Sequence, residues 1–180
     1  MAFSAALAAL GLALAASENP VHVDILRLSS GGYIVSGRFE VSAPIETAWA
    51  VLTDYEGLEG FVSGVRESRV EGRALGGATV SQEAEASFLG LSRNMRVRLD
   101  VRERPLESIS FEDGYGRDFM RYRGAWRLWS SSAATSVAYS LEAEPRKGGP
   151  GPVARRVLRR SVWRLLGEVR EEILRRAPPP

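Results

Sequence analysis

Residues 152–176 read PVARRVLRRSVWRLLGEVREEILRR, and their apolar members recur at the spacing of one helix face. The recurring residues lie four, three, four and four positions apart: Leu158, Val162, Leu165, Val169 and Ile173. Such a stripe predicts an amphipathic helix that must bury one side against another element. Glycines at 148, 149 and 151 precede it, Pro152 suits its first turn, and prolines at 178–180 follow it.

The other side of this predicted helix is basic. Eight arginines lie there against three glutamates, a surplus of five positive charges that exceeds the net charge of +2 of the whole chain. The simpler interpretation is a solvated helix back, because a helix whose apolar stripe is committed to a sheet shows its charges to water. The alternative is weak contact with a membrane surface, in which the arginines bind anionic lipid headgroups.

The composition fits one globular domain: 180 residues, of which 44% are hydrophobic and 26% charged. The basic residues are nearly all arginines without a Lys/Arg tract, which argues against nucleic acid as a partner. The chain has no cysteine, and this excludes disulfides, thiolate metal sites and cysteine nucleophiles. A single histidine, His22 on the first predicted strand, argues against a zinc site or a Ser-His triad.

Residues 1–19 differ from the rest of the chain. Positions 3–16 are almost entirely Ala and Leu, and Ala13-Leu14-Ala15 offers small residues at the spacing that a signal peptidase reads. This pattern predicts a signal peptide and export, most simply to a periplasm, although no Lys or Arg follows Met1. A retained membrane anchor, which needs about 20 apolar residues, and a cytoplasmic protein are the alternatives.

From residue 62 onward apolar and polar residues alternate, the period of a strand with one buried face. The clearest row is Met95, Val97, Leu99 and Val101, which alternates with charged residues. The other predicted strands, an early hairpin included, span 21–25, 33–41, 64–73, 78–88, 107–112, 119–130 and 135–144. Two short helices are predicted after the hairpin, at 45–53 with a cap near Ser42 and at 55–61 with Asp54 as the cap.

This order predicts an α+β fold in a single domain over residues 20–177. A curved antiparallel sheet of about seven or eight strands wraps around the long C-terminal helix, since each element must bury its apolar face against the other. Side chains do not easily fill such a concave space. The gap between helix and sheet is therefore the expected ligand site.

Several stretches resemble the START-like, or SRPBCC, superfamily, in its branch of polyketide cyclases/dehydrases and coenzyme Q-binding proteins. The resemblance covers about residues 21–176 and is carried by VSAP at 41–44, AWAVLTDYEGL at 48–58, GRDF at 116–119, GAWRL at 124–128 and EEILRR at 171–176. It implies a helix-grip fold with a deep apolar cavity, whose relatives carry lipids, quinones or polyketides and in some cases cyclise polyketide chains. None of these stretches is a catalytic motif, so the resemblance marks a fold.

The candidate ligand contacts lie on the predicted inner face of the sheet and on the helix stripe. Within residues 119–130, Tyr122 and Trp126 share one face and arginines occupy the other, so the rings are expected inside. Rings with a polar tip suit a cavity that holds an apolar body and fixes one carbonyl or hydroxyl, although core packing explains the same pattern. The full set is Phe61, Phe88, Leu99, Phe111, Tyr122, Trp126, Tyr139, Leu158, Val162 and Leu165.

These patterns predict binding of a hydrophobic small molecule, such as a lipid, a quinone or a polyketide-like compound, without catalysis, metal or cofactor. One alternative is an enzyme of the cyclase or dehydratase type, and another is a protein–protein adaptor with an exposed apolar patch. Glu83 and Glu85 share one strand face and could serve acid–base chemistry. The apolar residues on the other face of that strand, Val80, Ala84, Ala86 and Phe88, are expected to point inward, which places the glutamates in water.

Overall fold

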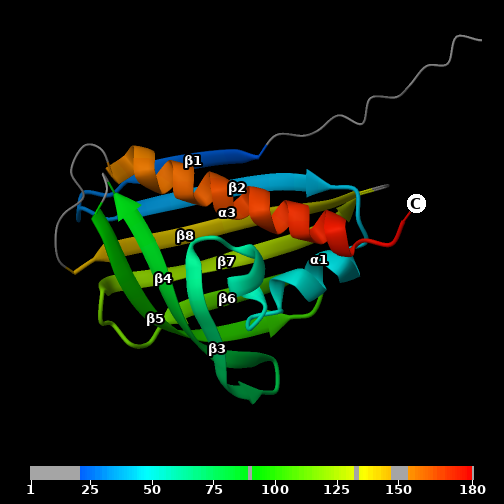
Figure 1. Ribbon diagram of the computed structural model, residues 1–180, viewed down its shortest axis with the longest axis horizontal. Helices are drawn as coiled ribbons and strands as arrows, with labels where there is room; N and C mark the ends of the chain where they lie inside the picture. The colour runs from blue at the N-terminus through cyan, green and yellow to red at the C-terminus, as the bar shows by residue number, and fades with distance from the viewer. Residues whose placement is uncertain (1–20, 89–90, 132–133, 147–153, 180) are drawn as a thin grey trace, which may run out of the picture.

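The structure is a computed structural model in which residues 21–88, 91–131, 134–146 and 154–179 are described, without the side chains of residues 86–88, 91–93 and 154. Eight strands form one antiparallel sheet with the order β1-β2-β8-β7-β6-β5-β4-β3 (Figure 1). Their bounds are β1 His22–Arg27, β2 Tyr33–Val41, β3 Val65–Ala74, β4 Gly77–Phe88, β5 Leu91–Arg104, β6 Ser108–Asp113, β7 Phe119–Ser131 and β8 Ala134–Pro145. The predicted curved antiparallel sheet is therefore confirmed.

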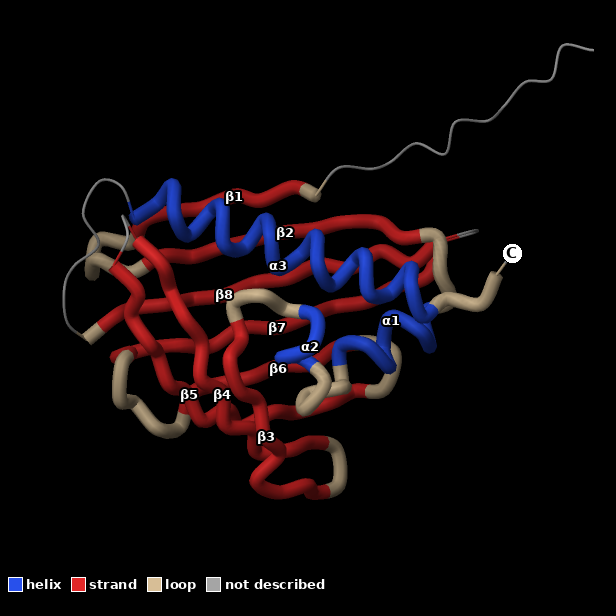
Figure 2. The backbone as a smooth tube through the Cα atoms, viewed as in Figure 1, coloured by secondary structure: helices blue, strands red, loops and turns tan. Residues whose placement is uncertain are grey.

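The helices of the described chain lie on one side of this sheet, called here the inner face (Figures 1 and 2). They are α1 Ile45–Leu52, α2 Leu58–Phe61 and α3 Ala154–Arg176. The long helix α3 packs on β1 and β2 and contacts α1 and α2. No helix in the described ranges is long and apolar enough to cross a membrane. The predictions for residues 1–19 and for a helix start at Pro152 lie outside the described residues.

The first short helix starts at residue 45 as predicted, but its cap and the start of the second differ from their prediction. No side chain caps α1, and the residue before its first turn is Pro44, so the predicted cap near Ser42 is wrong. A capping side chain must stand directly before the first helical residue, and Ser42 lies too far upstream. The Asp54 carboxylate does accept a hydrogen bond, from the backbone N–H of Gly57 at 3.1 Å. That bond closes a turn, so α2 begins only at Leu58.

The buried face of α3 is rotated slightly from the predicted apolar stripe. Its buried residues are Val162, Leu166, Val169 and Ile173. The predicted members Leu158 and Leu165 are half-buried and pack at the edge of the core. Leu166 lies directly over Gly37 of β2, where a side chain would overlap its Cδ1 atom. The absence of a side chain at Gly37 therefore lets α3 approach the sheet closely.

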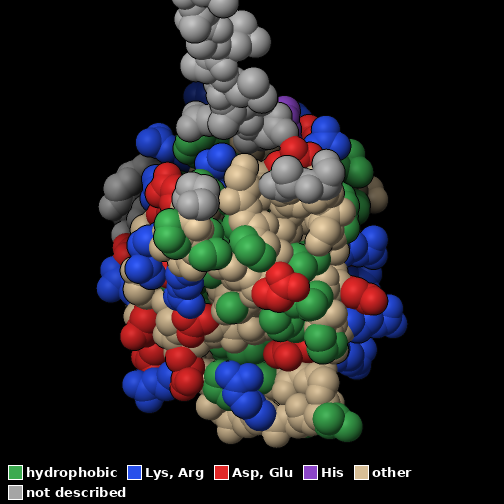
Figure 3. Space-filling model, turned by 90° about the vertical axis from the view of Figure 1, so that its right-hand side faces the viewer, with side chains coloured by type: hydrophobic (Ala, Val, Ile, Leu, Met, Phe, Trp, Pro, Cys, Tyr) green, Lys and Arg blue, Asp and Glu red, His purple; other side chains and the backbone are tan. Residues whose placement is uncertain are grey.

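Alternation along the strands separates the apolar inner face from a charged outer face. On β5 the residues Val97, Leu99 and Val101 are buried, and the charged residues between them are exposed. Outer-face charges meet across strands, as in the ion pair of Arg96 with Glu83 at 2.8 Å. In the end view of Figure 3, most Lys and Arg side chains lie toward the edges and hydrophobic side chains gather between them. The inner face of the sheet is therefore apolar, and it is the face on which α3 packs.

Charged contacts tie the last turn of α3 to the rest of the domain. The buried Glu172 carboxylate accepts hydrogen bonds of 2.6 to 2.7 Å from Arg175 and Arg176. Arg176 also contacts Asp54, with 2.8 Å between nitrogen and oxygen, and its guanidinium lies 5.5 Å from the centroid of the Phe61 ring. The hydrogen bonds, the one from Arg175 first, lower the pKa of Glu172 to about 2. The C-terminal end of α3 is thereby joined to the turn between α1 and α2.

Replacing Gly37 by alanine is expected to destabilise the protein, because the new Cβ atom collides with Leu166 in a packed layer. Overpacking of this kind lowers the free energy of unfolding by about 1–3 kcal/mol, which urea unfolding followed by circular dichroism measures. Gly72→Ala is the matched control, since a Cβ atom at Gly72 meets no atom within 4 Å. Equal stability of the two variants would contradict the close approach of α3.

Replacing Glu172 by glutamine is expected to lower the free energy of unfolding at neutral pH by about 1–2 kcal/mol, because bonds to a charged carboxylate are lost. The pKa of Glu172 is depressed from 4.5 to about 2 by folding. Its stabilisation is therefore present above pH 4.5 and lost as the pH falls toward 2. Unfolding curves of the native protein and the variant should converge over that range. Glu171→Gln, on the exposed side of the same turn, is the control, and a pH-independent effect of Glu172→Gln would refute the assignment.

Candidate functional site

An aromatic cluster, Phe111, Tyr122, Trp126 and Tyr139, covers the middle of the inner face on strands β6, β7 and β8. Trp126 and Tyr139 are cross-strand partners with ring centroids 4.5 Å apart. The Phe111 ring lies 6.1 Å from that of Tyr122 and 6.4 Å from that of Tyr139. It leans over Gly124, where a Cβ atom would overlap it. The four rings meet on the face that their alternation predicts.

A β-bulge adds a fifth ring to this place. The pairing of β7 with β8 shifts register between Phe119 and Arg121, and such a shift changes the face that the following residues occupy. Phe119 and Tyr122, three positions apart, therefore share the inner face, with ring centroids 4.8 Å apart. Strict alternation assigns them to opposite faces, which is why Phe119 is absent from the predicted set.

The hydroxyl groups of Tyr122 and Tyr139 have no hydrogen-bond partner in the described part of the chain. Within the same residues, no fully buried side-chain oxygen or nitrogen lacks a partner, so each of the two hydroxyl oxygens keeps some accessible surface. Burial, followed by the charge of Asp113, raises the pKa of Tyr122 to about 12. Burial also raises the pKa of Tyr139, with a smaller contribution from Tyr122. Both phenols are therefore neutral at physiological pH and free to donate a hydrogen bond.

The remaining predicted contacts surround the cluster. The aliphatic ones lie in the core or at its edge: Leu99, Leu158, Val162 and Leu165. Phe61 ends α2 and is half-buried beneath the guanidinium of Arg176. Phe88 belongs to β4, and its side chain lies outside the described residues. The structure thus brings the four residues of the aromatic cluster together and places the other described ones around them.

Two polar pairs on the inner side are absent from the predicted set. Tyr55 donates a hydrogen bond of 2.7 Å to Glu103 of β5, and Gln82 of β4 donates one of 3.3 Å to Ser68 of β3. Burial, the hydrogen bond to Glu103 and the charge of Glu103 raise the pKa of Tyr55 far above its ordinary value. Tyr55 and Glu103 are 48 residues apart in the chain. Only the position of Gln82 and Glu103 in their alternating rows could have indicated their inward direction.

The carboxylates expected in water lie on the outer face. Glu83 accepts a hydrogen bond of 2.8 Å from Arg96, and Glu85 pairs with Arg66. His22 is exposed on β1. Over the described ranges, no group of three or more His, Cys, Asp or Glu side chains could hold a metal ion. The acid–base interpretation of the glutamate pair therefore has no support from their placement.

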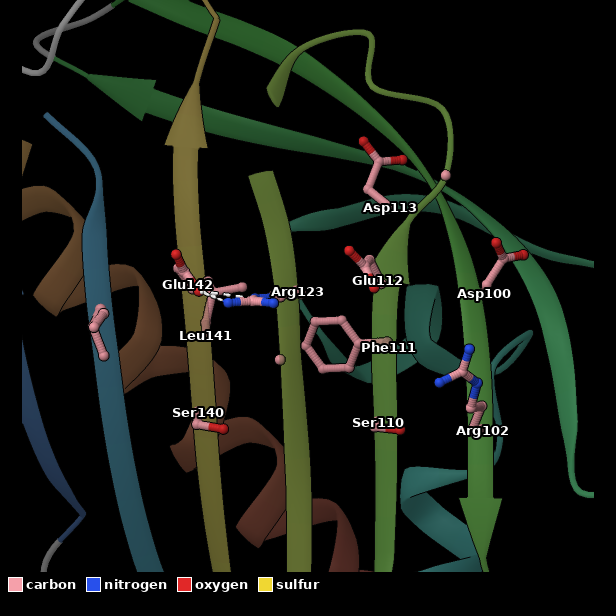
Figure 4. A pocket seen from close by; sticks show the side chains of 13 residues that line it. Asp100, Arg102, Ser110, Phe111, Glu112, Asp113, Arg123, Ser140, Leu141 and Glu142 are labelled. Carbon is pink, nitrogen blue, oxygen red and sulfur yellow. Dashed lines mark hydrogen bonds and ion pairs between the residues drawn. The ribbon is translucent and has the colours of Figure 1, made fainter. Parts of the chain in front are cut away.

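A groove of about 540 Å³ lies on the outer face, with the helices behind the sheet in the view of Figure 4. The small side chains of Ser110 and Ser140 leave room there between charged neighbours. Glu142 in its wall is bound by Arg123 at 2.7 Å and by Arg121 at 3.0 Å, and the hydrogen bond from Arg123 is the main cause of its lowered pKa. Walls that carry charges of both signs do not suit an apolar ligand. The inner face is the better candidate site.

Replacing Tyr122 by phenylalanine is expected to make the protein less sensitive to alkali. The phenol ionises near pH 10.0 in the unfolded chain but only near 12 in the folded protein. Its contribution to stability is thus present below pH 10.0 and lost as the pH rises toward 12. Urea unfolding at neutral and alkaline pH should show a smaller alkaline loss in the variant. Tyr115→Phe, which removes an exposed hydroxyl, is the control, and an alkaline profile of Tyr122→Phe equal to that of the native protein would count against the buried phenol.

Several solved structures share this fold. TTHA0849 from Thermus thermophilus is 22% identical, with a TM-score of 0.68 over 79% of this chain and 97% of its own. The Zhui aromatase/cyclase from a Streptomyces species is 19% identical, with a TM-score of 0.66 over 86% of this chain and 96% of its own. Human STARD10 is 14% identical, with a TM-score of 0.70 over 89% of this chain and 71% of its own. At these identities the likeness shows the fold alone.

The sequence itself matches a family. No curated protein matches the chain. The family described as "Polyketide cyclase / dehydrase and lipid transport" matches residues 41–170, which run from the end of β2 into the C-terminal half of α3. This match covers most of the chain and agrees with the helix-grip arrangement of sheet and helix. The chain therefore belongs to the polyketide cyclase/dehydrase and lipid transport family.

Proposed function

We propose that the protein binds a hydrophobic small molecule, such as a lipid, a quinone or a polyketide-like compound, between α3 and the inner face of the sheet, without catalysing a reaction. The observation that carries this proposal is the aromatic cluster, whose two phenol groups have no partner in the described chain. Because each hydroxyl oxygen keeps some accessible surface, water is its partner in the ligand-free protein. A ligand oxygen would replace that water as the acceptor of the hydrogen bond.

The cluster offers two kinds of contact to such a ligand. An apolar body would lie against the rings of Phe111 and Trp126, since removing apolar surface from water is favourable. The hydroxyl groups of Tyr122 and Tyr139 would donate hydrogen bonds to a carbonyl or hydroxyl on that body. Their raised pKa values keep both protons in place at physiological pH. The expected ligand is therefore mostly apolar and carries one or two oxygen atoms at one end.

The names of structural relatives point to both binding and catalysis, as in human StAR-related lipid transfer protein 5 and the Zhui aromatase/cyclase. A cyclase needs a group that moves protons near neutral pH. The phenol of Tyr122, with a pKa of about 12, is poorly matched to that task. The carboxylate of Glu103 is engaged by Tyr55, and Gln82 does not ionise. These inner-face groups favour binding over catalysis.

Native mass spectrometry after exposure of the protein to a lipid extract tests this function. The native protein should retain a small molecule, and Trp126→Ala should weaken its retention by about tenfold because an aromatic contact is lost. Trp129→Ala is the matched control, since Trp129 lies on the same strand with 49% of its surface exposed. A native protein that stays free of ligand, or two tryptophan variants that behave alike, would defeat the proposal.

A further inference from the structure

The first half of α3 carries positive charge alone. Its five arginines are all exposed: Arg155, Arg156, Arg159, Arg160 and Arg164. From Ala154 the first acidic residue of the helix is Glu168. Together with Trp163, these arginines are called here the basic half of α3. The second half of the helix, by contrast, mixes both signs of charge.

The two halves also differ in how their arginines are engaged. In the second half, Arg170 donates a hydrogen bond of 3.0 Å to the Glu40 carbonyl, and Arg175 and Arg176 bind Glu172. No arginine of the basic half takes part in an ion pair or hydrogen bond within the described residues. Its charge is therefore uncompensated. A face that served solubility alone would be expected to resemble the second half, where acids and bases alternate.

A large aromatic residue, Trp163, lies among these arginines. Trp163 is 56% exposed on α3. Arg160, Arg159 and Arg156 precede it by three, four and seven positions, which places them on the same side of the helix. Tryptophan is favoured where an apolar ring meets a wet, polar layer. An exposed tryptophan framed by arginines is thus typical of a helix that lies on a membrane surface.

Helix stability does not explain this arrangement. The N-terminal end of a helix carries a partial positive charge and is stabilised by acidic side chains. The first turn of α3 contains no acidic residue, and Arg155 and Arg156 lie near its start. These positive charges oppose the helix dipole. Their position therefore does not serve the stability of the helix.

We propose that the basic half of α3 docks on the surface of a membrane that contains anionic phospholipid. Each arginine near such a surface strengthens binding by roughly fivefold, and salt weakens the attraction. The apolar stripe of α3 is buried in the domain, so the helix lies on the headgroups and does not enter the bilayer. Docking and the proposed ligand site use opposite sides of α3, so this inference does not depend on the proposed function.

Vesicle flotation tests the docking. The ligand-free protein is mixed with vesicles of phosphatidylcholine alone or of phosphatidylcholine with phosphatidylserine. It should float only with the vesicles that contain phosphatidylserine, and less as salt is added. The combined variant Arg156→Gln, Arg159→Gln and Arg160→Gln should bind about a hundredfold more weakly. A blue shift of tryptophan fluorescence on binding should be present in the native protein and absent in Trp163→Phe.

A control of equal charge comes from the outer face of the sheet. Arg38, Arg104 and Arg127 are exposed there, and replacing all three by glutamine removes the same charge from another surface. This control should still float with phosphatidylserine vesicles. The proposal is overturned if the native protein does not bind them at low salt, if the control loses as much binding as the helix variant, or if Trp163→Phe keeps the blue shift. If the native protein does not bind the phosphatidylserine vesicles, an acidic macromolecule becomes the candidate partner of the basic half of α3.

Discussion

The close approach of α3 to β2 is the contact on which the other features depend. Leu166 occupies the space that Gly37 leaves free of a side chain. This contact lets the helix lie close to the sheet and turns the Leu166 side of the helix toward β2. The rotation turns Val162 toward the sheet and leaves Trp163 in water. The rotation that buries one side of the helix therefore also decides which residues its outer surface presents.

A second glycine has a corresponding role within the sheet. Gly124 leaves room for the ring of Phe111, which lies near both Tyr122 of β7 and Tyr139 of β8. The rings need this room because cross-strand neighbours stand only about 5 Å apart. The interior is thus shaped at two points by glycines, whose lack of a side chain leaves space for a neighbouring residue. Sequence patterns of apolar and polar residues report which residues point inward, but they do not report where space is left between them.

The fold was largely predictable because burial of one face imposes a period on each element. The same argument fails where the period is locally ambiguous or broken. Leu165 and Leu166 are adjacent, and the helical period allows either one to be the buried residue. The space over Gly37, which lies on a strand far away in the sequence, favours Leu166. Phe119 reaches the inner face through a bulge that alternation cannot express. The bond from Tyr55 to Glu103 joins residues 48 positions apart, which no local pattern records.

The strand order has a consequence for how the chain folds. Before β8 is made, the strands form two separate groups, β1-β2 and β7-β6-β5-β4-β3, which only β8 can join. Contacts between segments far apart in sequence slow folding, and an unpaired strand edge is exposed to other chains meanwhile. The helix that covers the inner face follows all of the strands in sequence. During synthesis the aromatic rings of that face therefore emerge first, and their cover arrives last.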